Sequence, residues 1–385
     1  MKKPCPLSQS WTPTRRGWLQ SLGATSAGLA LGGMLKENAQ ASPLAELPKS
    51  APKGTIKLSL NESPFGPSPK VVEAVRRHAA DLSRYSGDEH AAVSRHIAKL
   101  EGVSGDQVLL GEVLEPLGLH LGLQGAGGEF IYSSPGYTAL VEAAKPVGGV
   151  PIPVPLNSKL ENDLDALAAR ITGKTRALFL VNPHNPSGTV TPGPELLNFI
   201  RDISRRTLII VDEAYLEYTD DFKERTAVGL VAADANVAIF RTFSKIRGLA
   251  SLPFGYAVLP AALARELRAR GAGIPHVVGR LSLVAAGESL ADYSHLEKVR
   301  QVVRDERRKW HAWLDQAQLR HSDARGNFIF FESPQLQSEV AVGMRRRGVE
   351  IGRAFPPLDH WTRITIGTPT ENTQARNLLR EVLKG

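Results

Sequence analysis

Short runs of apolar, often β-branched residues recur along the middle of the chain, with stretches of helical spacing between them. The runs lie at residues 108–110, 129–132, 150–154, 177–181, 208–211, 237–240 and 254–259. Several are apolar throughout, which is typical of strands buried on both faces of a parallel sheet. Intervening segments such as 164–170 and 195–206 have helical spacing. The pattern therefore predicts an α/β fold with a seven-stranded, mostly parallel sheet and flanking helices.

The texture changes after about residue 260. Helical stretches dominate at 261–270, 295–316, 339–347 and 372–384, with short strands at 328–331, 349–351 and 364–366. We expect a large domain over residues 71–259 and a smaller α+β domain over residues 260–385. Residues 42–70 are predicted to form an N-terminal arm, because the Pro-rich stretch 61–69 suits neither a regular helix nor a central strand. A helix is expected to begin near Pro69, since proline is favoured in the first turn.

Residues 1–41 have the order of an export signal. A basic stretch ends in Arg15-Arg16-Gly17-Trp18-Leu19, an apolar Gly/Ala-rich run follows to Leu35, and Ala39-Gln40-Ala41 offers small residues for cleavage. The paired arginines predict a twin-arginine signal, read by the twin-arginine translocase, and a periplasmic enzyme. The apolar run is short for a membrane span. An uncleaved anchor and a chance basic terminus are the alternatives.

Charge and cysteine content fit this interpretation. The 385 residues carry 47 Lys+Arg and 39 Asp+Glu, a formal net charge of +8. Residues 1–41 hold five basic residues and one acid, so half of the excess belongs to the signal. Cys5, the single cysteine, also lies there, which excludes an intramolecular disulfide and a Cys-based zinc cluster. No zinc-finger spacing or RNA-binding pattern is present, so we expect no nucleic-acid partner and no metal site.

Four polar segments follow predicted strands, at the edge where open α/β sheets bind their ligands. They are Tyr132–Tyr137, Asn182–Gly188, Asp212–Tyr215 and Arg241–Lys245. Alone, each could be no more than turn chemistry, a helix cap or a solvated lysine.

Together they supply what a pyridoxal phosphate enzyme needs. Lys245 offers an amine for the aldehyde, and Asp212 offers a carboxylate that keeps the pyridine nitrogen protonated. Asn185 and Tyr215 offer donors for the ring oxygen. Tyr137 offers an aromatic face against the ring.

Residues 55–385 resemble the fold-type I aminotransferases, most of all the histidinol-phosphate aminotransferase branch. The resemblance rests on these motifs: Asn61–Pro67, Arg84-Tyr85, Asn182–Gly188, Val211–Tyr215, Arg241–Lys245, Gly326–Phe328 and Arg363–Thr368. It implies that Lys245 forms a Schiff base with the cofactor, that Asp212 and Tyr215 assist, and that Ser244 contacts the phosphate.

The resemblance also implies roles for residues outside these four segments. The helix start at Leu114 and Glu115 would help to hold the cofactor phosphate. Tyr85 would reach the phosphate of the neighbouring subunit, which implies a homodimer. Arg363, with Arg353 as a second candidate and Asn185 beside them, would bind the anionic group of the substrate. Arginine suits this task because it stays charged and offers paired donors.

Two departures concern the cofactor phosphate. The family pattern G-x-G-[SA]-[DE]-E is replaced by Gly111-Glu112-Val113-Leu114-Glu115-Pro116, in which Val113 stands at a glycine position and Glu112 could repel an anion. Pro253 stands where the family has a phosphate-binding arginine. We expect Arg247 to compensate, and an Arg247→Ala substitution would then weaken cofactor binding.

We therefore expect an aminotransferase that moves an amino group from an amino acid or related amine to a 2-oxo acid acceptor. An exported enzyme would not meet histidinol phosphate, so the resemblance supports the chemistry better than that substrate. The same scaffold also suits decarboxylation, racemisation or elimination of an amino acid. A non-catalytic ligand-binding descendant is a further alternative, motivated by the altered phosphate motif.

Overall fold

The computed structural model describes residues 54–384. The signal predicted over residues 1–41 lies outside the described residues, as does the first part of the predicted arm.

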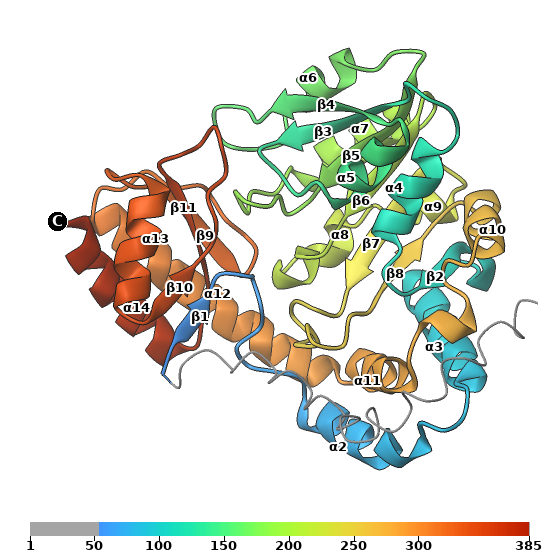
Figure 1. Cartoon of the computed structure of the whole chain (residues 1–385), viewed down its shortest axis with the longest axis horizontal. Helices are drawn as coiled ribbons and strands as arrows, with labels where there is room; N and C mark the ends of the chain where they lie inside the picture. The colour runs from blue at the N-terminus through green and yellow to red at the C-terminus, as the bar shows by residue number, and fades with distance from the viewer. Residues whose placement is uncertain (1–53, 385) are drawn as a thin grey trace, which may run out of the picture. The chain divides into compact units, whose positions relative to one another are not determined.

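A seven-stranded sheet lies at the centre of the cofactor-binding region predicted from the sequence (Figure 1). Its strands are β2 (Val108–Leu110), β3 (Glu129–Ser134), β4 (Val150–Pro155), β5 (Thr175–Val181), β6 (Leu208–Asp212), β7 (Val237–Thr242) and β8 (Gly255–Val258). They are ordered β2-β8-β7-β6-β5-β3-β4. The pairs from β4 to β7 are parallel, whereas β8 is antiparallel to both β7 and β2. The predicted fold class and its seven strands are confirmed.

Each face of this sheet has its own hydrophobic core. Because successive side chains of a strand point to opposite faces, Leu178 and Leu180 of β5 pack on one side and Phe179 packs on the other. The first face is covered by α3 (Gly87–Glu101), α7 (Gly193–Ile203) and α11 (Arg280–Ala291), and the second by α4 (Leu114–Gly122), α5 (Ala139–Ala144) and α10 (Ala261–Ala269). Burial on both sides explains why the strands are apolar throughout.

Two helices beyond residue 260 belong to these cores. Leu267 of α10 packs with the second core, and Leu283 of α11 packs with the first. The change in the sequence pattern near residue 260 therefore marks where the chain becomes rich in helices. The two cores of the seven-stranded sheet continue beyond this position. The boundary between the two domains stays a prediction.

A separate core forms in the C-terminal region. It is built by α12 (Tyr293–Gln316), α13 (Gln337–Arg346) and α14 (Pro369–Leu383) around two small sheets. β9 (Phe328–Glu332) and β11 (Trp361–Thr365) are antiparallel, and β10 (Val349–Ile351) pairs in parallel with β1 (Ile56–Leu58). Trp310 of α12 lies fully buried in this core. β11 begins at Trp361, earlier than the predicted start at residue 364.

The N-terminal arm joins this C-terminal core. Its strand β1 was not predicted, because three residues without a neighbouring partner give no local signal. Residues 61–68 then form neither helix nor strand, and α2 (Pro69–His78) begins at the expected proline. Ser68 Oγ accepts a hydrogen bond from Val71 N at 3.3 Å and caps this helix. The backbone N of Asn61 donates to Thr365 Oγ1 at 2.9 Å, which ties the arm to β11.

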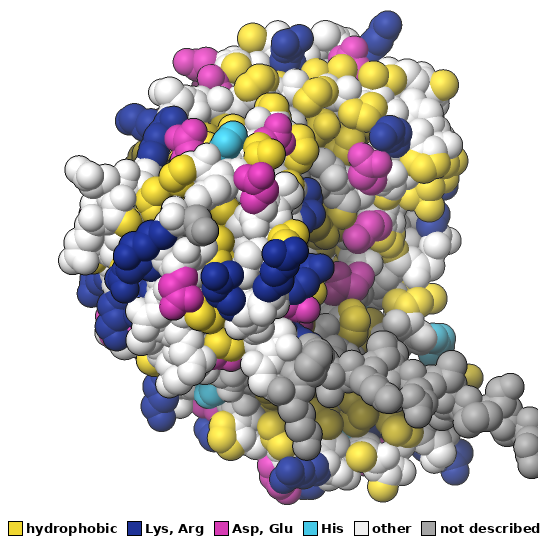
Figure 2. Space-filling view, turned by 60° about the vertical axis from the view of Figure 1, so that its left-hand side comes forward, with side chains coloured by type: hydrophobic (Ala, Val, Ile, Leu, Met, Phe, Trp, Pro, Cys, Tyr) yellow, Lys and Arg dark blue, Asp and Glu magenta, His cyan; other side chains and the backbone are white. Residues whose placement is uncertain are grey.

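The described surface mixes charges of both signs. On the face shown in Figure 2, Lys and Arg form separate groups with acidic and apolar side chains between them. The structure also contains three short helices, α6 (Leu164–Ala169), α8 (Phe222–Arg225) and α9 (Val228–Ala232). Among residues 54–384, no helix is both long enough and apolar enough to cross a membrane.

Candidate active site

A cavity of about 190 Å³ opens where β5, β6 and β7 end and α4 begins. The carboxyl ends of these parallel strands meet at one edge of the sheet, which is where such folds bind ligands. Most of the predicted site residues border this cavity: Leu114, Glu115, Tyr137, Asn185, Asp212, Tyr215, Ser244 and Lys245. The three other predicted residues, Tyr85, Arg353 and Arg363, do not border it.

Asp212 is the buried carboxylate of the site. It ends β6, is 7% exposed, and its Oδ1 accepts a hydrogen bond from Ala214 N at 2.9 Å. Burial raises its pKa to about 6, although the Ala214 hydrogen bond and Lys245 act in the opposite direction. A cation placed against this carboxylate would lower the pKa again. Asp212 is therefore suited to face a protonated ring nitrogen.

Lys245 lies in the turn after β7. Its Nζ donates to Leu60 O at 3.4 Å and lies 5.7 Å from the centre of the Tyr215 ring. The turn closes through a hydrogen bond from Gly248 N to Lys245 O at 3.0 Å. Gly248 has φ +71°, and a Cβ there would lie 2.3 Å from the carbonyl carbon of Gly66. Glycine is therefore required for the turn to pack against the arm.

Asn185, Tyr215 and Arg363 form a chain of hydrogen bonds beside the cavity. Arg363 Nη1 donates to Asn185 Oδ1 at 2.6 Å, and Asn185 Nδ2 donates to the Tyr215 hydroxyl at 3.4 Å. Asn61 Nδ2 also donates to that hydroxyl, at 3.1 Å. The Asn185 amide is thus oriented from one side by the arginine. The Asn185 amide has one further N–H to donate, and Asn185 and Tyr215 both border the cavity.

Arg363 is a buried cation that reaches the site through Asn185. Its guanidinium lies 5.6 Å from the Phe328 ring centre and 5.1 Å from that of Phe355, and its Nη2 donates to Ser59 O at 2.8 Å. Burial lowers its pKa to about 10, so it stays charged at neutral pH. Its Nε is buried and has no hydrogen-bond partner among the described residues. Gly352 packs against this atom, since a Cβ at that glycine would lie 3.1 Å from it.

Arg353 lies near Arg363 but in a more open position. Its guanidinium stacks over the Phe355 ring at 4.3 Å and donates to Ala354 O at 3.0 Å. The charge of Arg353 contributes to the lowered pKa of Arg363. The two arginines therefore form a positive region that Arg363 connects to the cavity through Asn185. Their role in substrate binding stays a prediction.

Tyr85 lies outside the cavity of its own chain. It is 85% exposed, and its ring meets His276 edge-on with the ring centres 5.0 Å apart. No role within its own subunit follows from this position, and the expected contact across a dimer stays a prediction.

The far end of the cavity differs from what an anion would favour. α4 begins at Leu114, and Val113 precedes it with φ −107°, so valine is accommodated without strain. Gly111 keeps a positive φ of +113°. Glu112 and Glu115 both border the cavity, and burial together with Glu115 raises the pKa of Glu112. Burial and nearby Asp212 likewise raise the pKa of the Tyr137 hydroxyl.

Arg247 does not supply the positive charge expected at this end. Its Nη2 pairs with Glu217 Oε1 at 2.6 Å, and its Nη1 donates to Ser289 O at 2.7 Å. It does not border the cavity. The expectation that Arg247 replaces the arginine missing at Pro253 is therefore wrong, because the turn at residues 245–248 directs its side chain to α11 and to the Glu217 carboxylate.

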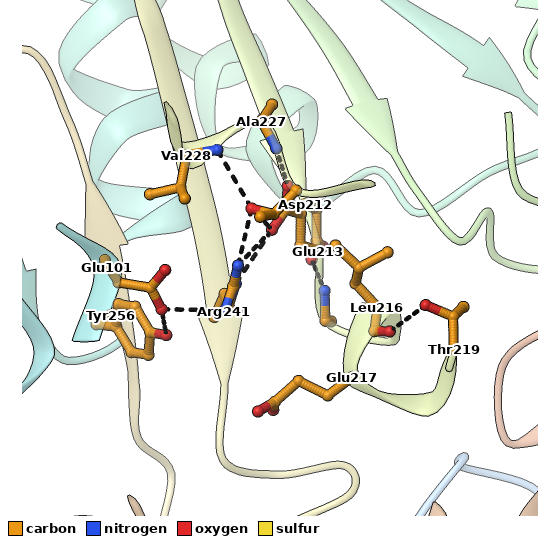
Figure 3. Close-up of polar contacts among 12 residues, drawn as sticks. Glu101, Asp212, Glu213, Leu216, Glu217, Thr219, Ala227, Val228, Arg241 and Tyr256 are labelled. Carbon is orange, nitrogen blue, oxygen red and sulfur yellow. Dashed lines mark hydrogen bonds and ion pairs between the residues drawn. The ribbon is translucent and has the colours of Figure 1, made fainter. Parts of the chain in front are cut away.

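A buried ionic network, of which Arg241 and Tyr256 border the cavity, was not predicted (Figure 3). Arg241 of β7 pairs with Glu213 at 2.9 Å and with Glu101 at 3.0 Å. Glu213 also accepts from Ala227 N at 2.8 Å, and the Tyr256 hydroxyl donates to Glu101 at 2.6 Å. Glu213 adjoins Asp212, and Arg241 lies four residues before Lys245, so the network fixes the two strand ends that carry them. The sequence does contain a signal for this network: Arg241 lies within the mostly apolar strand β7, and Glu213 directly follows the mostly apolar strand β6.

The described residues contain no group of three or more His, Cys, Asp or Glu side chains arranged to hold a metal ion. The cavity instead combines one amine, one guanidinium, one buried carboxylate, an amide and three phenols. Its strand ends fit an aromatic ring with a basic nitrogen, an oxygen substituent and an aldehyde. At the other end Ser244 and the start of α4 fit a phosphate, whereas the two glutamates oppose one.

Residues 53–379 match the family described as aminotransferase class I and II. The chain is 34% identical to an aromatic amino acid aminotransferase of Cutibacterium acnes over 89% of this chain and 97% of that protein. It is 33% identical to a histidinol-phosphate aminotransferase of Moorella thermoacetica over 86% of each.

Solved structures agree with these sequence comparisons. A putative histidinol-phosphate aminotransferase of Erwinia carotovora atroseptica has a TM-score of 0.81 at 28% identity, with 87% of this chain and 98% of that chain covered. A histidinol-phosphate aminotransferase of Sinorhizobium meliloti, in complex with pyridoxal-5'-phosphate, has a TM-score of 0.78 at 25% identity, with 90% and 98% covered.

Proposed function

Since this chain belongs to the class I and II aminotransferase family, we propose that its pyridoxal-phosphate-dependent transamination uses Lys245 as the catalytic amine. The enzyme moves an amino group from a donor to a 2-oxo acid acceptor. The observation that supports Lys245 and its partners is their placement: the amine and the buried Asp212 carboxylate border one cavity at the ends of adjacent strands.

Pyridoxal phosphate supplies an aldehyde that captures amino groups and a ring that withdraws electrons from the substrate Cα. Lys245 would hold the aldehyde carbon, and its Nζ would move the proton that leaves Cα. Asp212 would keep the ring nitrogen protonated, because a buried carboxylate favours a cation beside it. Asn185 and Tyr215 would donate to the ring oxygen, and Tyr137 would cover the ring face. Ser244 and the amides of Leu114 and Glu115 would hold the phosphate.

Reductive trapping tests the role of Lys245. The protein is incubated with pyridoxal phosphate, reduced with borohydride and digested, and the modified peptide is located by mass spectrometry. We expect one cofactor attached to Lys245 and none in Lys245→Ala. Stable attachment to another lysine, or no attachment at all, would contradict the proposal.

The donor is proposed to be an amino acid that carries an anionic group within reach of Arg363. The buried guanidinium of Arg363 and the nearby charge of Arg353 favour a carboxylate at this position. A panel of amino acids, scored by formation of the matching 2-oxo acid, identifies the donor. Arg363→Gln should raise KM for the donor more than it lowers kcat, and an unchanged KM would count against this assignment.

We further propose a homodimer in which Tyr85 of one subunit reaches the cofactor phosphate of the other. The exposed position of Tyr85 supports this, together with the exposed apolar side chains Leu60, Leu82 and Val277. Such side chains suit a surface that another copy covers.

Export is proposed from residues 1–41 alone. Arg15-Arg16, the apolar run and the small residues near Ala41 support a twin-arginine signal and a periplasmic enzyme. Cell fractionation of the full chain and of an Arg15→Lys, Arg16→Lys variant tests it. Periplasmic activity that persists in the variant would contradict the twin-arginine route.

A further inference from the structure

A second cavity, of about 710 Å³, lies away from the Lys245 site. Its walls come from the loops after β4 and β5, the turn before α8 with α8 itself, helix α12 and the segment that precedes β9. A smaller cavity of about 140 Å³ adjoins it and shares Asp220, Arg307, Asp323 and Arg325 with it. None of the residues around either cavity borders the active-site cavity.

Basic side chains outnumber acidic ones around these two cavities. The basic residues are Lys159, Arg225, Arg304, Arg307, Arg308 and Arg325, and the acidic residues are Glu161, Asp220, Asp221 and Asp323. With the two histidines neutral, the lining carries an excess of two positive charges. An anion is therefore the kind of ligand that this lining favours.

Each of the three aspartates already has an arginine partner. Asp221 pairs with Arg225 at 2.7 Å, Asp220 with Arg304 at 2.5 Å, and Asp323 with Arg325 at 2.7 Å. The fourth acid, Glu161, accepts a hydrogen bond from Asn157 Nδ2 at 3.1 Å. None of these carboxylates pairs with Arg307, although Asp220 and Asp323 are near enough to raise the pKa of its guanidinium.

Arg307 is the buried cation at this position. It is only 7% exposed, and its Nη1 donates to Gly326 O at 2.9 Å. Within residues 54–384 it forms no ion pair with a carboxylate, whereas its neighbours on α12, Arg304 and Arg308, both do. Burial and the charges of Arg325 and Arg304 lower its pKa to about 10, so it remains charged at neutral pH. A buried charge without a counter-ion is unfavourable.

We propose that this second cavity binds a small molecule through a carboxylate or phosphate group that pairs with Arg307. A planar guanidinium with several donors matches such an oxyanion, and one of its two terminal nitrogens is already fixed in direction by Gly326 O. Lys159 at the rim adds a second positive charge for the same ligand. The site is separate from the amino donor and from the cofactor, so its ligand is not a substrate of the transamination.

The proposal is tested by calorimetric titration of the cofactor-loaded enzyme at low ionic strength. Inorganic phosphate and succinate are the two probes, one for each source of the oxyanion. We expect saturable binding of at least one probe, and a dissociation constant raised by about tenfold or more in Arg307→Gln, as loss of a charge-assisted pair implies. Whichever probe binds more tightly identifies the ligand as a phosphate or a carboxylate.

Three control variants distinguish binding in this cavity from binding elsewhere on the protein. Arg363→Gln, in the active site, and Arg345→Gln, exposed on α13, should both retain the binding that Arg307→Gln loses. Asp323→Asn removes a competing carboxylate and should tighten binding. If Arg307→Gln does not fold, Arg307→Lys replaces it and should weaken binding while keeping the charge. Absence of saturable binding in the wild-type enzyme, or loss of binding in Arg363→Gln instead, would overturn the proposal.

Discussion

Asp212 shows how burial prepares a single residue for its role. The carboxyl lies at the end of β6 with one backbone donor and Lys245 nearby, and burial still raises its pKa to about 6. The cost of burying the Asp212 charge is therefore only partly offset until a cation is placed against the carboxylate. The cofactor-free enzyme is therefore less stable with the ionised Asp212 than it would be with a neutral side chain at this position.

Asp212→Asn tests this in the cofactor-free protein. The native carboxyl releases its proton at a higher pH than the unfolded chain, so the native state holds more protons between the ordinary pKa of 3.8 and about 6. Stability contributed at this site therefore falls as the pH rises through that window, by roughly 3 kcal/mol in all. Urea unfolding of both proteins across the window should show that the free energy of unfolding of the variant increases relative to that of the wild type as pH rises. A difference independent of pH would contradict the raised pKa.

Glu112 is expected to oppose the cofactor phosphate. Its carboxylate borders the cavity near the start of α4, and burial with Glu115 raises its pKa. Below that pKa the group is neutral and tolerates the phosphate, whereas above it the two repel. We predict that Glu112→Gln binds pyridoxal phosphate several-fold more tightly at neutral pH.

Spectroscopic titration with cofactor over a range of pH distinguishes this from a general effect of charge. Wild-type affinity should decline with rising pH more steeply than that of Glu112→Gln. The exposed Glu195→Gln on α7 removes the same charge elsewhere and should behave like the wild type. Equal affinities and parallel pH profiles for wild type and Glu112→Gln would show that Glu112 points away from the phosphate.

At the scale of elements, β6 and β7 deliver Asp212 and Lys245 to one edge of the sheet, and the Arg241 network joins their ends. Glu213 is 2% exposed and pairs with Arg241 at 2.9 Å. Removal of one partner from such a pair leaves a buried charge uncompensated.

We predict that Arg241→Met destabilises the fold by roughly 3–5 kcal/mol. Arg241→Met combined with Glu213→Gln should cost less than the sum of the two single variants, by more than about 0.5 kcal/mol. Urea unfolding of all four proteins provides the measurement. The exposed pair Arg320–Glu332, whose atoms lie 3.6 Å apart, is the matched control and should show almost no coupling. Additive effects at Arg241 and Glu213 would mean that the two side chains do not act as a unit.

Sequence could predict the elements that carry their own signal. The seven strands are apolar because the sheet is buried on both faces, and Asp212 ends one of them while Lys245 lies in the turn after another. It could not predict β1, whose partner β10 lies almost three hundred residues later. The contact between Arg363 and Asn185 has the same character, with 178 residues between them. The prediction for Arg247 was wrong because the tight turn at residues 245–248 sets the direction of its side chain. Its position two residues after Lys245 in the sequence does not reveal that direction.

At the scale of the whole molecule, the proposed dimer divides each active site between two chains. Tyr85 is 85% exposed in its own chain and does not border its own cavity. If it serves the partner's site, a Lys245→Ala subunit and a Tyr85→Ala subunit together form one complete site. We therefore predict that such a hybrid dimer has about half the wild-type activity, since one of its two sites is intact.

The hybrid is prepared by co-expression with two different tags, and both parent dimers are assayed beside it. Each parent should be strongly impaired. A hybrid no more active than its parents, or a chain that sediments as a monomer, would contradict the shared site.

Transfer of a labelled amino group tests the central claim most directly. The enzyme is incubated with cofactor, an amino acid labelled in its amino nitrogen and an unlabelled 2-oxo acid, and the products are analysed by mass spectrometry. We predict that the label appears in the amino acid formed from the 2-oxo acid, and that Lys245→Ala abolishes this transfer. Release of the label as ammonia, formation of an amine with loss of carbon dioxide, or undiminished transfer in Lys245→Ala would contradict it.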